Sequence, residues 1–445
     1  MAVKFNDVFL LYMMNSPTFK QVLSQQEFST QELLECLQTH DHLIYLNNHF
    51  QPIIGFPAEH FVLIQNNDIQ FSSTQFQCLQ DFFDASLNLQ SPCLTMGFVS
   101  YDYAANQQVQ AQEKSQPSLF LGQYLHYLSY ENDIWYFNSF DANAQYIFQE
   151  LDNHLKNKAT SKKLTLNTPC QSRWDKTQYA NAFQKVQDYI VAGDCYQINL
   201  TQEFTAQATG SLLSTTDTFW TLTNAPYSGY LRINDFELLS CSPELFIDFE
   251  ANKKIVTKPI KGTMPRYADL ILDEQSKNTL KHSEKDQAEN VMIVDLLRND
   301  LSVYAEAGSV KTPKLFNIES FNQVHHMVSE IEATLKAEVN PFEVLMSALP
   351  GGSITGAPKI RAMQIIDELE QGARGAYCGS MGYFNSNGTG SWNILIRSIQ
   401  KFQDELSVWA GGGITIASDC NAEYQECFDK VDALLNLLNT YYKPE

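Results

Sequence analysis

Segments typical of strands and of helices succeed one another in this chain without the regular alternation of a parallel sheet. Short apolar runs bounded by polar turns predict strands at 43–46 and 61–64. Further strand signals stand at 236–249 and 254–260, and Asn252 between them suggests a hairpin. This order argues against a doubly wound fold and predicts an α+β class with a largely antiparallel sheet.

Four helices are expected from capping residues or apolar spacing, at 175–193, 283–297, 358–369 and 421–441. Asp175 can cap the first, and Gly193 can end it. Ser283, followed three residues later by Asp286, resembles a capping pair that opens the second. Between the first 150 residues and this helical part, a polar stretch at 154–173 predicts an exposed connection.

Composition places the chain among globular proteins and excludes several functions. Of its 445 residues, 44% are hydrophobic and 12% aromatic, so the chain has too many large apolar side chains to be disordered. Thirty basic against 51 acidic residues give a formal charge of -21, which repels nucleic acid and anionic membranes. We expect neither as a partner.

The apolar and cysteine patterns indicate a cytoplasmic protein. The longest early apolar run, Val8 to Met14, has neither the length of a membrane span nor a cleavage site behind it. The nine cysteines contain no C-x-x-C pair, which argues against a disulfide framework or a zinc cluster. Most are expected to be small buried hydrophobes.

Two predicted helices carry carboxylates on one face. Glu423, Glu426 and Lys430 fall at positions i, i+3 and i+7, and Asp286 and Glu289 are three residues apart. For an isolated helix, a solvated face with an ion pair is the ordinary interpretation. If the two faces met, they could instead hold a hard cation such as Mg²⁺, which takes only one or two protein carboxylates.

Two glycine-bearing stretches, at 350–359 and 410–414, could bring bare backbone amides close to an anion. Neither matches a nucleotide-binding fingerprint, and tight turns are the competing interpretation. Lys261 lies at the end of a predicted buried strand, where a lowered pKa would free its amine as a nucleophile. Glu244, one strand earlier, could pair with Lys261 across the hairpin or serve as a general acid.

Together these residues resemble the chorismate-utilising enzymes, and within them the aminodeoxychorismate synthase component I branch. The blocks that carry the resemblance stand in family order over about 170–440, with one further N-terminal element: Met96 to Asp102, Gly193 to Asn199, Ser242 to Glu244, Pro259 to Thr263, Asp286 to Asp300, His325 to Ser329, Gly351 to Lys359, Ala410 to Ile414 and Glu423 to Lys430. The resemblance implies a single α+β unit of orthogonally packed, mainly antiparallel sheets flanked by helices. In it, an N-terminal region, 1–160, would pack on the same core as a catalytic region, 170–445.

The resemblance also implies a role for each candidate residue. Lys261 would be the nucleophile and Glu244 the proton donor, with His326 near the reacting ring. Mg²⁺ would be held by Glu289 and Glu426, with Asp286 and Glu423 as indirect or water-mediated partners. The remaining substrate-binding positions would be Gln197, Gly262, Thr355, Tyr383, Arg397, Gly411, Gly412, Gly413 and Lys430.

Two residues distinguish branches of the family. Anthranilate synthases typically have Ala where this chain has Lys261, which favours 4-amino-4-deoxychorismate as the product. Isochorismate synthases use a lysine base at the position of Gln197, so ammonia is the expected nucleophile here. The residues outside these blocks show no Cys-His-Glu arrangement typical of an amidotransferase. Ammonia would therefore come from a separate glutamine amidotransferase subunit.

Two alternatives and one departure stay open. The chain could be an anthranilate synthase component I, or a non-catalytic subunit that binds chorismate. The family usually has Asp-Thr where this chain has Ser391 and Trp392. Trp392 could form part of a substituted pocket wall or be a strand residue turned to the core.

Overall fold

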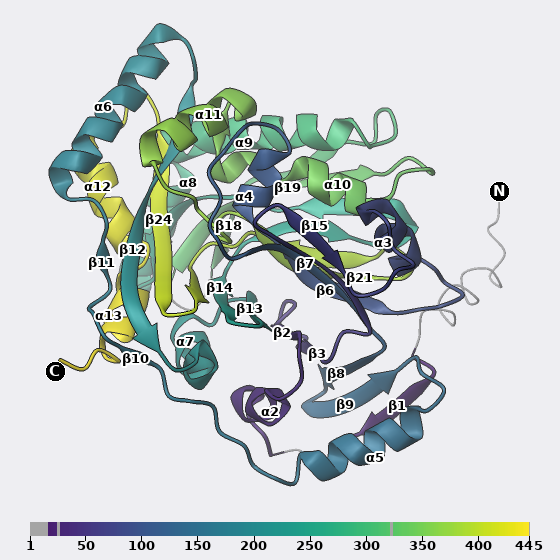
Figure 1. The fold of residues 1–445 in the computed structure, drawn as a ribbon. Helices are drawn as coiled ribbons and strands as arrows, with labels where there is room; N and C mark the ends of the chain where they lie inside the picture. Colours follow the sequence, from purple (N-terminus) through teal and green to yellow (C-terminus); the bar gives the residue numbers. More distant parts are fainter. Residues whose placement is uncertain (1–16, 25–26, 321–323, 445) are drawn as a thin grey trace.

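The structure, a computed structural model, describes residues 17–24, 27–320 and 324–444 (Figure 1). The apolar run from Val8 to Met14 lies outside the described residues. No helix in the described part of the chain is both long and apolar enough to cross a bilayer. Of the nine cysteines, all but Cys78 and Cys420 are buried, which confirms the expected packing role of most of them.

The described strands form two large sheets whose ladder pairings are antiparallel. The first has thirteen strands, in the order β1 (Phe19–Val22), β9 (Ile134–Ser139), β8 (His126–Glu131), β3 (Ile53–Gly55), β2 (Leu43–Leu46), β13 (Tyr227–Ile233), β14 (Phe236–Ser242), β23 (Ser398–Phe402), β24 (Glu405–Ile414), β12 (Gln197–Thr209) and β10 (Thr165–Leu166), with β11 (Gln171–Ser172) and β20 (Gly356–Ala357) also on β12. The second has eleven, in the order β17 (Ile260–Pro265), β19 (Val324–Thr334), β16 (Lys254–Thr257), β15 (Leu245–Phe249), β22 (Gly390–Asn393), β21 (Ser380–Asn385), β6 (Leu94–Val99), β7 (Pro117–Tyr124), β4 (His60–Gln65) and β5 (Asp68–Phe71), with β18 (Lys311–Ser320) also on β19. The predicted α+β class is confirmed.

Helices flank the two sheets (Figure 1). Those in the described residues are α2 (Thr30–Leu37), α3 (Leu79–Ser86), α4 (Tyr101–Asn106), α5 (Ala144–His154), α6 (Lys176–Ala192), α7 (Thr216–Thr223), α8 (Leu270–Lys281), α9 (Glu284–Ser302), α10 (Pro341–Ala348), α11 (Lys359–Glu370), α12 (Cys420–Asp429) and α13 (Asp432–Asn439), with short 3₁₀ turns η1 (Leu212–Thr215), η2 (Ala251–Lys253) and η3 (Gly352–Ile354). In Figure 1, α6 and α12 lie beside the long pair β12 and β24.

The helix starts predicted from capping residues are confirmed. The Asp175 side chain accepts from the Gln178 amide at the start of α6, and Gly193 ends that helix at φ 83°. Ser283 accepts from the Asp286 amide at the start of α9, which extends to Ser302. The prediction of a single helix at 421–441 is wrong. The segment is broken at Val431, whose φ of -125° and ψ of 3° separate α12 from α13.

Each sheet contains strands from the predicted N-terminal region, 1–160, and from the predicted catalytic region, 170–445. In the first sheet β2 pairs with β13, with Tyr45 opposite Tyr230. In the second sheet β6 pairs with β21, with Gly97 opposite Gly382. The polar connection at 154–173 contributes the short strands β10 and β11 to the first sheet.

Two neighbouring chain segments pass from one sheet to the other. The chain leaves β14 and enters β15 through Pro243 and Glu244, and it leaves β22 and enters β23 through 394–397. The segments are joined because the Ser242 hydroxyl donates to the Ile394 carbonyl and the Ile394 amide donates to the Glu244 carbonyl, at 2.5 and 3.1 Å. Residues between strands can turn their side chains away from both sheets, so these crossings place polar groups beside a cavity.

Candidate active site

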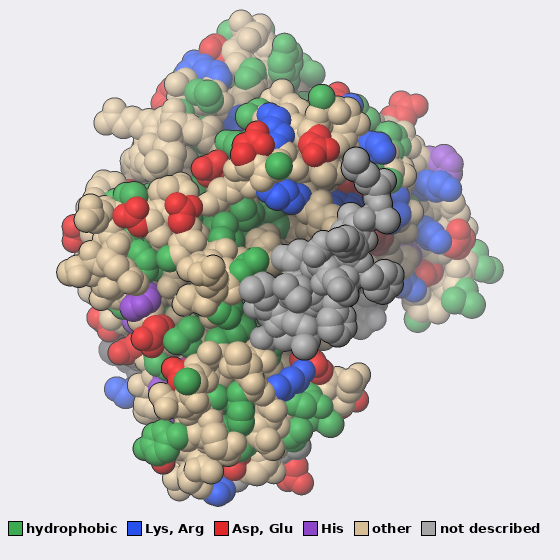
Figure 2. All heavy atoms as spheres, turned by 90° about the vertical axis from the view of Figure 1, so that its right-hand side faces the viewer, with side chains coloured by type: hydrophobic (Ala, Val, Ile, Leu, Met, Phe, Trp, Pro, Cys, Tyr) green, Lys and Arg blue, Asp and Glu red, His purple; other side chains and the backbone are tan. Residues whose placement is uncertain are grey.

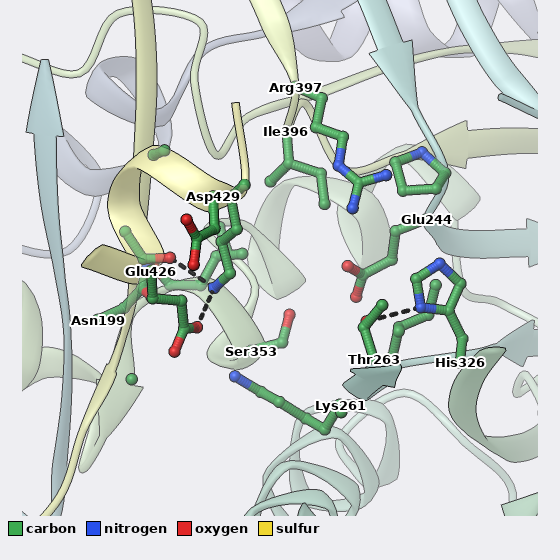
Figure 3. Close-up of a pocket in the computed structure, with 18 of the residues that line it drawn as sticks. Asn199, Glu244, Lys261, Thr263, His326, Ser353, Ile396, Arg397, Glu426 and Asp429 are labelled. Carbon is green, nitrogen blue, oxygen red and sulfur yellow. Dashed lines mark hydrogen bonds and ion pairs between the residues drawn. The ribbon is translucent and has the colours of Figure 1, made fainter. Parts of the chain in front are cut away.

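A cavity of about 520 Å³ lies beside these crossings, a size typical of small-molecule sites. Its wall comes from β12, β17, β19, α9, η3, β24, α12, both crossing segments and Tyr377. Figure 3 shows Lys261, Glu244 and Arg397 directed into it from different sides. The candidate residues that line it are Glu244, Lys261, Gly262, Asp286, Glu289, His326, Arg397, Gly411, Gly413, Glu423, Glu426 and Lys430.

The Lys261 amine is uncommitted in the cavity. No hydrogen bond or ion pair within 4.0 Å engages it among the residues that the structure describes. Burial lowers the pKa of Lys261, although the charge of Glu289 opposes that shift. Lys261 is the second residue of β17, a strand separate from β16, so the prediction that it ends the buried strand at 254–260 is wrong.

Glu244 is a buried carboxyl on the same cavity, with 6% of its surface exposed. Burial raises its pKa to about 7, while the charge of Lys261 acts in the opposite direction. Nearby, His326 Nδ1 lies 2.8 Å from the Thr263 hydroxyl. Burial and the charge of Arg397 lower the pKa of His326 to about 4, so its imidazole is neutral at pH 7.

Cations and an open strand edge could receive an anion. Arg397 contacts no acidic side chain within 4.0 Å in the described part of the chain, so its guanidinium is available to a carboxylate. From Trp409 to Ile414, β24 pairs with β12 on one edge and has left β23 on the other. Gly411 and Gly413 line the cavity there, and the Lys430 amine donates to the Gly411 carbonyl at 2.7 Å.

The acidic faces of α9 and α12 meet at the cavity. Lys285 lies 4.0 Å from Glu289 and 3.8 Å from Glu423, and therefore joins the two helices. Burial raises the pKa of Glu289 and of Glu423, and the charge of Glu426 further raises that of Glu423. Burial also acts to raise the pKa of Glu426, but Lys430, at 2.7 Å, lowers it overall.

Four predicted substrate-binding residues are absent from the cavity wall. Thr355 is fully buried and its hydroxyl donates to the Gly351 carbonyl. Gln197 is buried behind Gly413, because a side chain added at the Gly413 α-carbon would meet the Gln197 side-chain amide. Gly412 lies beneath the carboxylates of α12 instead, while Tyr383 lines two other pockets, both with Asn48.

Sequence reasoning did not single out several residues of the wall, among them Asn199, Lys285, Ser353, Tyr377, Trp409 and Asp429. Tyr377 stands six positions before Tyr383, and only the fold shows which tyrosine reaches the cavity. In the same way, Ser353 lines the cavity and Thr355, two positions later, does not. Trp392 is fully buried in β22 and packs against Phe384, so it is a core residue and not part of this wall.

The donor set suits a hard divalent cation. Carboxylates from two helices gather where burial raises the pKa of Glu289 and Glu423, and a cation would relieve that cost. Across the described residues, no three His, Cys, Asp or Glu side chains form a group that could hold a metal by themselves. One or two carboxylates completed by ligand oxygens is the arrangement that Mg²⁺ accepts.

Comparison with known sequences identifies the class of this protein. A sequence model described as chorismate binding enzyme matches residues 38–436, so the chain belongs to the chorismate binding enzyme family. Aminodeoxychorismate synthase component 1 of Salmonella typhimurium is 47% identical over 273 residues, which are 61% of this chain and 60% of that protein. The protein of the same name from Escherichia coli is 47% identical over 274 residues, 62% of this chain and 60% of that protein. The match thus spans about 60% of the length of these relatives.

Solved structures share the fold. Anthranilate synthase component I from Streptococcus pneumoniae superposes with a TM-score of 0.75 at 24% identity, covering 86% of this chain and 91% of that one. The isochorismate synthase MenF from Escherichia coli gives a TM-score of 0.74 at 18% identity, covering 97% of this chain and 98% of that one. At these identities the likeness concerns the fold alone.

Proposed function

We propose that this chain is an aminodeoxychorismate synthase component I, which converts chorismate and ammonia to 4-amino-4-deoxychorismate for 4-aminobenzoate and folate synthesis. The observation that carries the proposal is the uncommitted Lys261 amine on the same cavity as the buried carboxyl of Glu244. The relatives named above, at 47% identity, support the same activity.

The cavity's charges suit a substrate with two carboxylates. Arg397, Lys430 and the open edge at Gly411 and Gly413 would receive the enolpyruvyl carboxylate. The ring carboxylate would lie toward Glu289 and Glu426. Mg²⁺ held by these two residues, with Asp286 and Glu423 beside them, would neutralise that end and fix the ring.

In the proposed reaction, the neutral Lys261 amine attacks the ring and a carbon–nitrogen bond forms. The ring hydroxyl at carbon 4 leaves as water after it takes the proton of Glu244. Ammonia then bonds to carbon 4, the lysine is expelled, and a proton from the incoming nitrogen restores Glu244. His326, neutral at pH 7, would contact the ring and would not serve as the acid.

The direct test incubates the protein with chorismate, Mg²⁺ and ammonium and converts the product with aminodeoxychorismate lyase. We expect 4-aminobenzoate, identified by chromatography against a standard. Recovery of anthranilate would assign the chain to the other amino branch, to which a 37% identical anthranilate synthase component 1 of Haloarcula marismortui belongs by name. Chorismate binding without any turnover would favour the non-catalytic alternative.

A glutamine amidotransferase subunit is the proposed source of ammonia in the cell. The name "component 1" of the similar proteins supports a two-component system. We expect glutamine to replace ammonium only when that subunit is added. Glutamine-dependent turnover by this chain alone would contradict the proposal.

A further inference from the structure

A buried ion pair lies directly behind one wall of the cavity. Arg374 and Glu370 have side chains only 1% and 0% exposed, and neither lines the cavity. Arg374 Nε donates to Glu370 Oε2 at 2.9 Å and Nη2 donates to Oε1 at 2.7 Å, a two-pronged contact. A buried pair of this kind is costly to desolvate and is therefore better explained by what it orders than by stability alone.

The other donors of Arg374 hold two wall segments from distant parts of the sequence. Nη1 donates to the Ile354 carbonyl at 3.0 Å, and Nη2 donates to the Asn199 carbonyl at 2.7 Å. The guanidinium also lies 5.9 Å from the ring centre of Tyr377. Ile354, Asn199 and Tyr377 all line the cavity, so one side chain contacts three pieces of its wall.

Glu370 also connects the ion pair to the open edge of β24 at Gly411 and Gly413. Its Oε1 accepts from the Thr201 amide at 2.9 Å and from the Thr201 hydroxyl at 2.7 Å. Thr201 stands opposite Gly411 in the pairing of β12 with β24. The pair is therefore connected through one residue to the edge that would receive a substrate carboxylate.

We propose that Arg374, held by Glu370, is a positioning residue that fixes the β12, η3 and Tyr377 wall and so sets the affinity of the cavity for its substrate. The inference rests on the proposed function, with chorismate as the substrate. Lysine cannot replace arginine here, because an ammonium lacks the planar fork that reaches Glu370 and both carbonyls together. Lys261 and Glu244 stand on other segments, so the effect falls on binding.

The test compares Arg374→Lys and Glu370→Gln with the unaltered protein. We expect KM for chorismate to rise about tenfold while kcat changes by less than about twofold, since a shifted wall weakens ground-state and transition-state binding together. Isothermal titration with chorismate should show the same loss of affinity. If the wild-type protein binds chorismate without turnover, only the proposed function is overturned. The titration would still show whether the two variants lose affinity for chorismate.

Glu237→Gln is the matched control. Glu237 is also a buried carboxylate, 4.0 Å from Lys401 and hydrogen-bonded to the Tyr230 hydroxyl, but none of these residues lines the cavity. It should lower the midpoint of thermal unfolding and leave KM within about twofold of the wild type. An equal rise in KM in this control would overturn the inference, as would unchanged KM in Arg374→Lys and Glu370→Gln.

A milder variant keeps the proposal testable if those two variants do not fold. Thr201→Val removes only the hydroxyl that donates to Glu370 and keeps the backbone contact. We expect this variant to fold, with KM raised about threefold by the partial loss of support. Wild-type KM in folded Thr201→Val would then overturn the inference.

Discussion

Lys261 and Glu244 are shifted toward their neutral forms by the same physical cause. Burial lowers the pKa of Lys261 and raises that of Glu244 to about 7. A neutral amine is a nucleophile and a protonated carboxyl is an acid, so the proposed mechanism draws both reagents from one desolvated cavity. Water alone would keep both side chains charged at neutral pH.

Replacing Lys261 with alanine tests the nucleophile. We expect the variant to lose 4-aminobenzoate formation in the coupled assay and to keep its fold by circular dichroism. Lys258→Ala is the control, since Lys258 stands three residues away, is 3.7 Å from Glu330 and does not line the cavity. Wild-type turnover in Lys261→Ala would remove the covalent step from the mechanism.

The pH profile tests Glu244. Because its pKa is about 7, the carboxyl holds its proton below that pH and loses it above, so kcat/KM should fall as pH rises through about 7. Glu244→Gln cannot donate a proton and should lower kcat by about 100- to 10,000-fold. Its residual activity should lack the descending limb; if the same limb remains, another group is the acid.

At the scale of elements, α9 and α12 act as a pair. Each exposes carboxylates three residues apart, and the fold brings the two faces to one end of the cavity, where Lys285 lies between them. The proposed Mg²⁺ site would therefore take carboxylates from both helices. The break at Val431 ends α12 beside Lys430, whose amine thus reaches both Glu426 and the Gly411 carbonyl.

Metal removal tests this pair of helices. We expect EDTA to abolish turnover and excess Mg²⁺ to restore it. Glu289→Gln should bind Mg²⁺ more weakly, seen as a higher Mg²⁺ concentration for half-maximal activity. Glu274→Gln, an exposed change in α8 away from the cavity, should need no extra Mg²⁺. Full activity in EDTA would contradict the metal proposal.

At the scale of the whole molecule, the two sheets are built jointly by the first 160 residues and the rest. The pairings of β2 with β13 and of β6 with β21 lie inside the sheets, not at their edges. Although the chain is strongly negative, acidic and basic side chains are interspersed among the described residues on the face in Figure 2. Its cations instead include a group of four in the cavity: Lys261, Lys285, Arg397 and Lys430.

Separate expression of residues 170–445 tests this joint construction. Without β2 and β6, the strands β13 and β21 would present unpaired edges and exposed apolar faces. We expect the fragment to lack cooperative thermal unfolding, while the full chain unfolds in a sharp transition followed by circular dichroism. A fragment that unfolds cooperatively would show that the catalytic region folds independently.

Features that rest on local interactions could be predicted from the amino-acid sequence. Asp175, Gly193 and Ser283 mark helix ends because a cap satisfies backbone groups within a few residues. Twelve of the sixteen predicted site residues line the cavity, although they make up fewer than half of the residues in its wall. The packing of the folded chain selects Tyr377 over Tyr383 and Ser353 over Thr355 for the cavity wall, and it places the Arg374–Glu370 pair behind that wall. Those outcomes depend on strands far apart in sequence packing against one another, and no local pattern encodes which side chain such packing leaves facing a cavity.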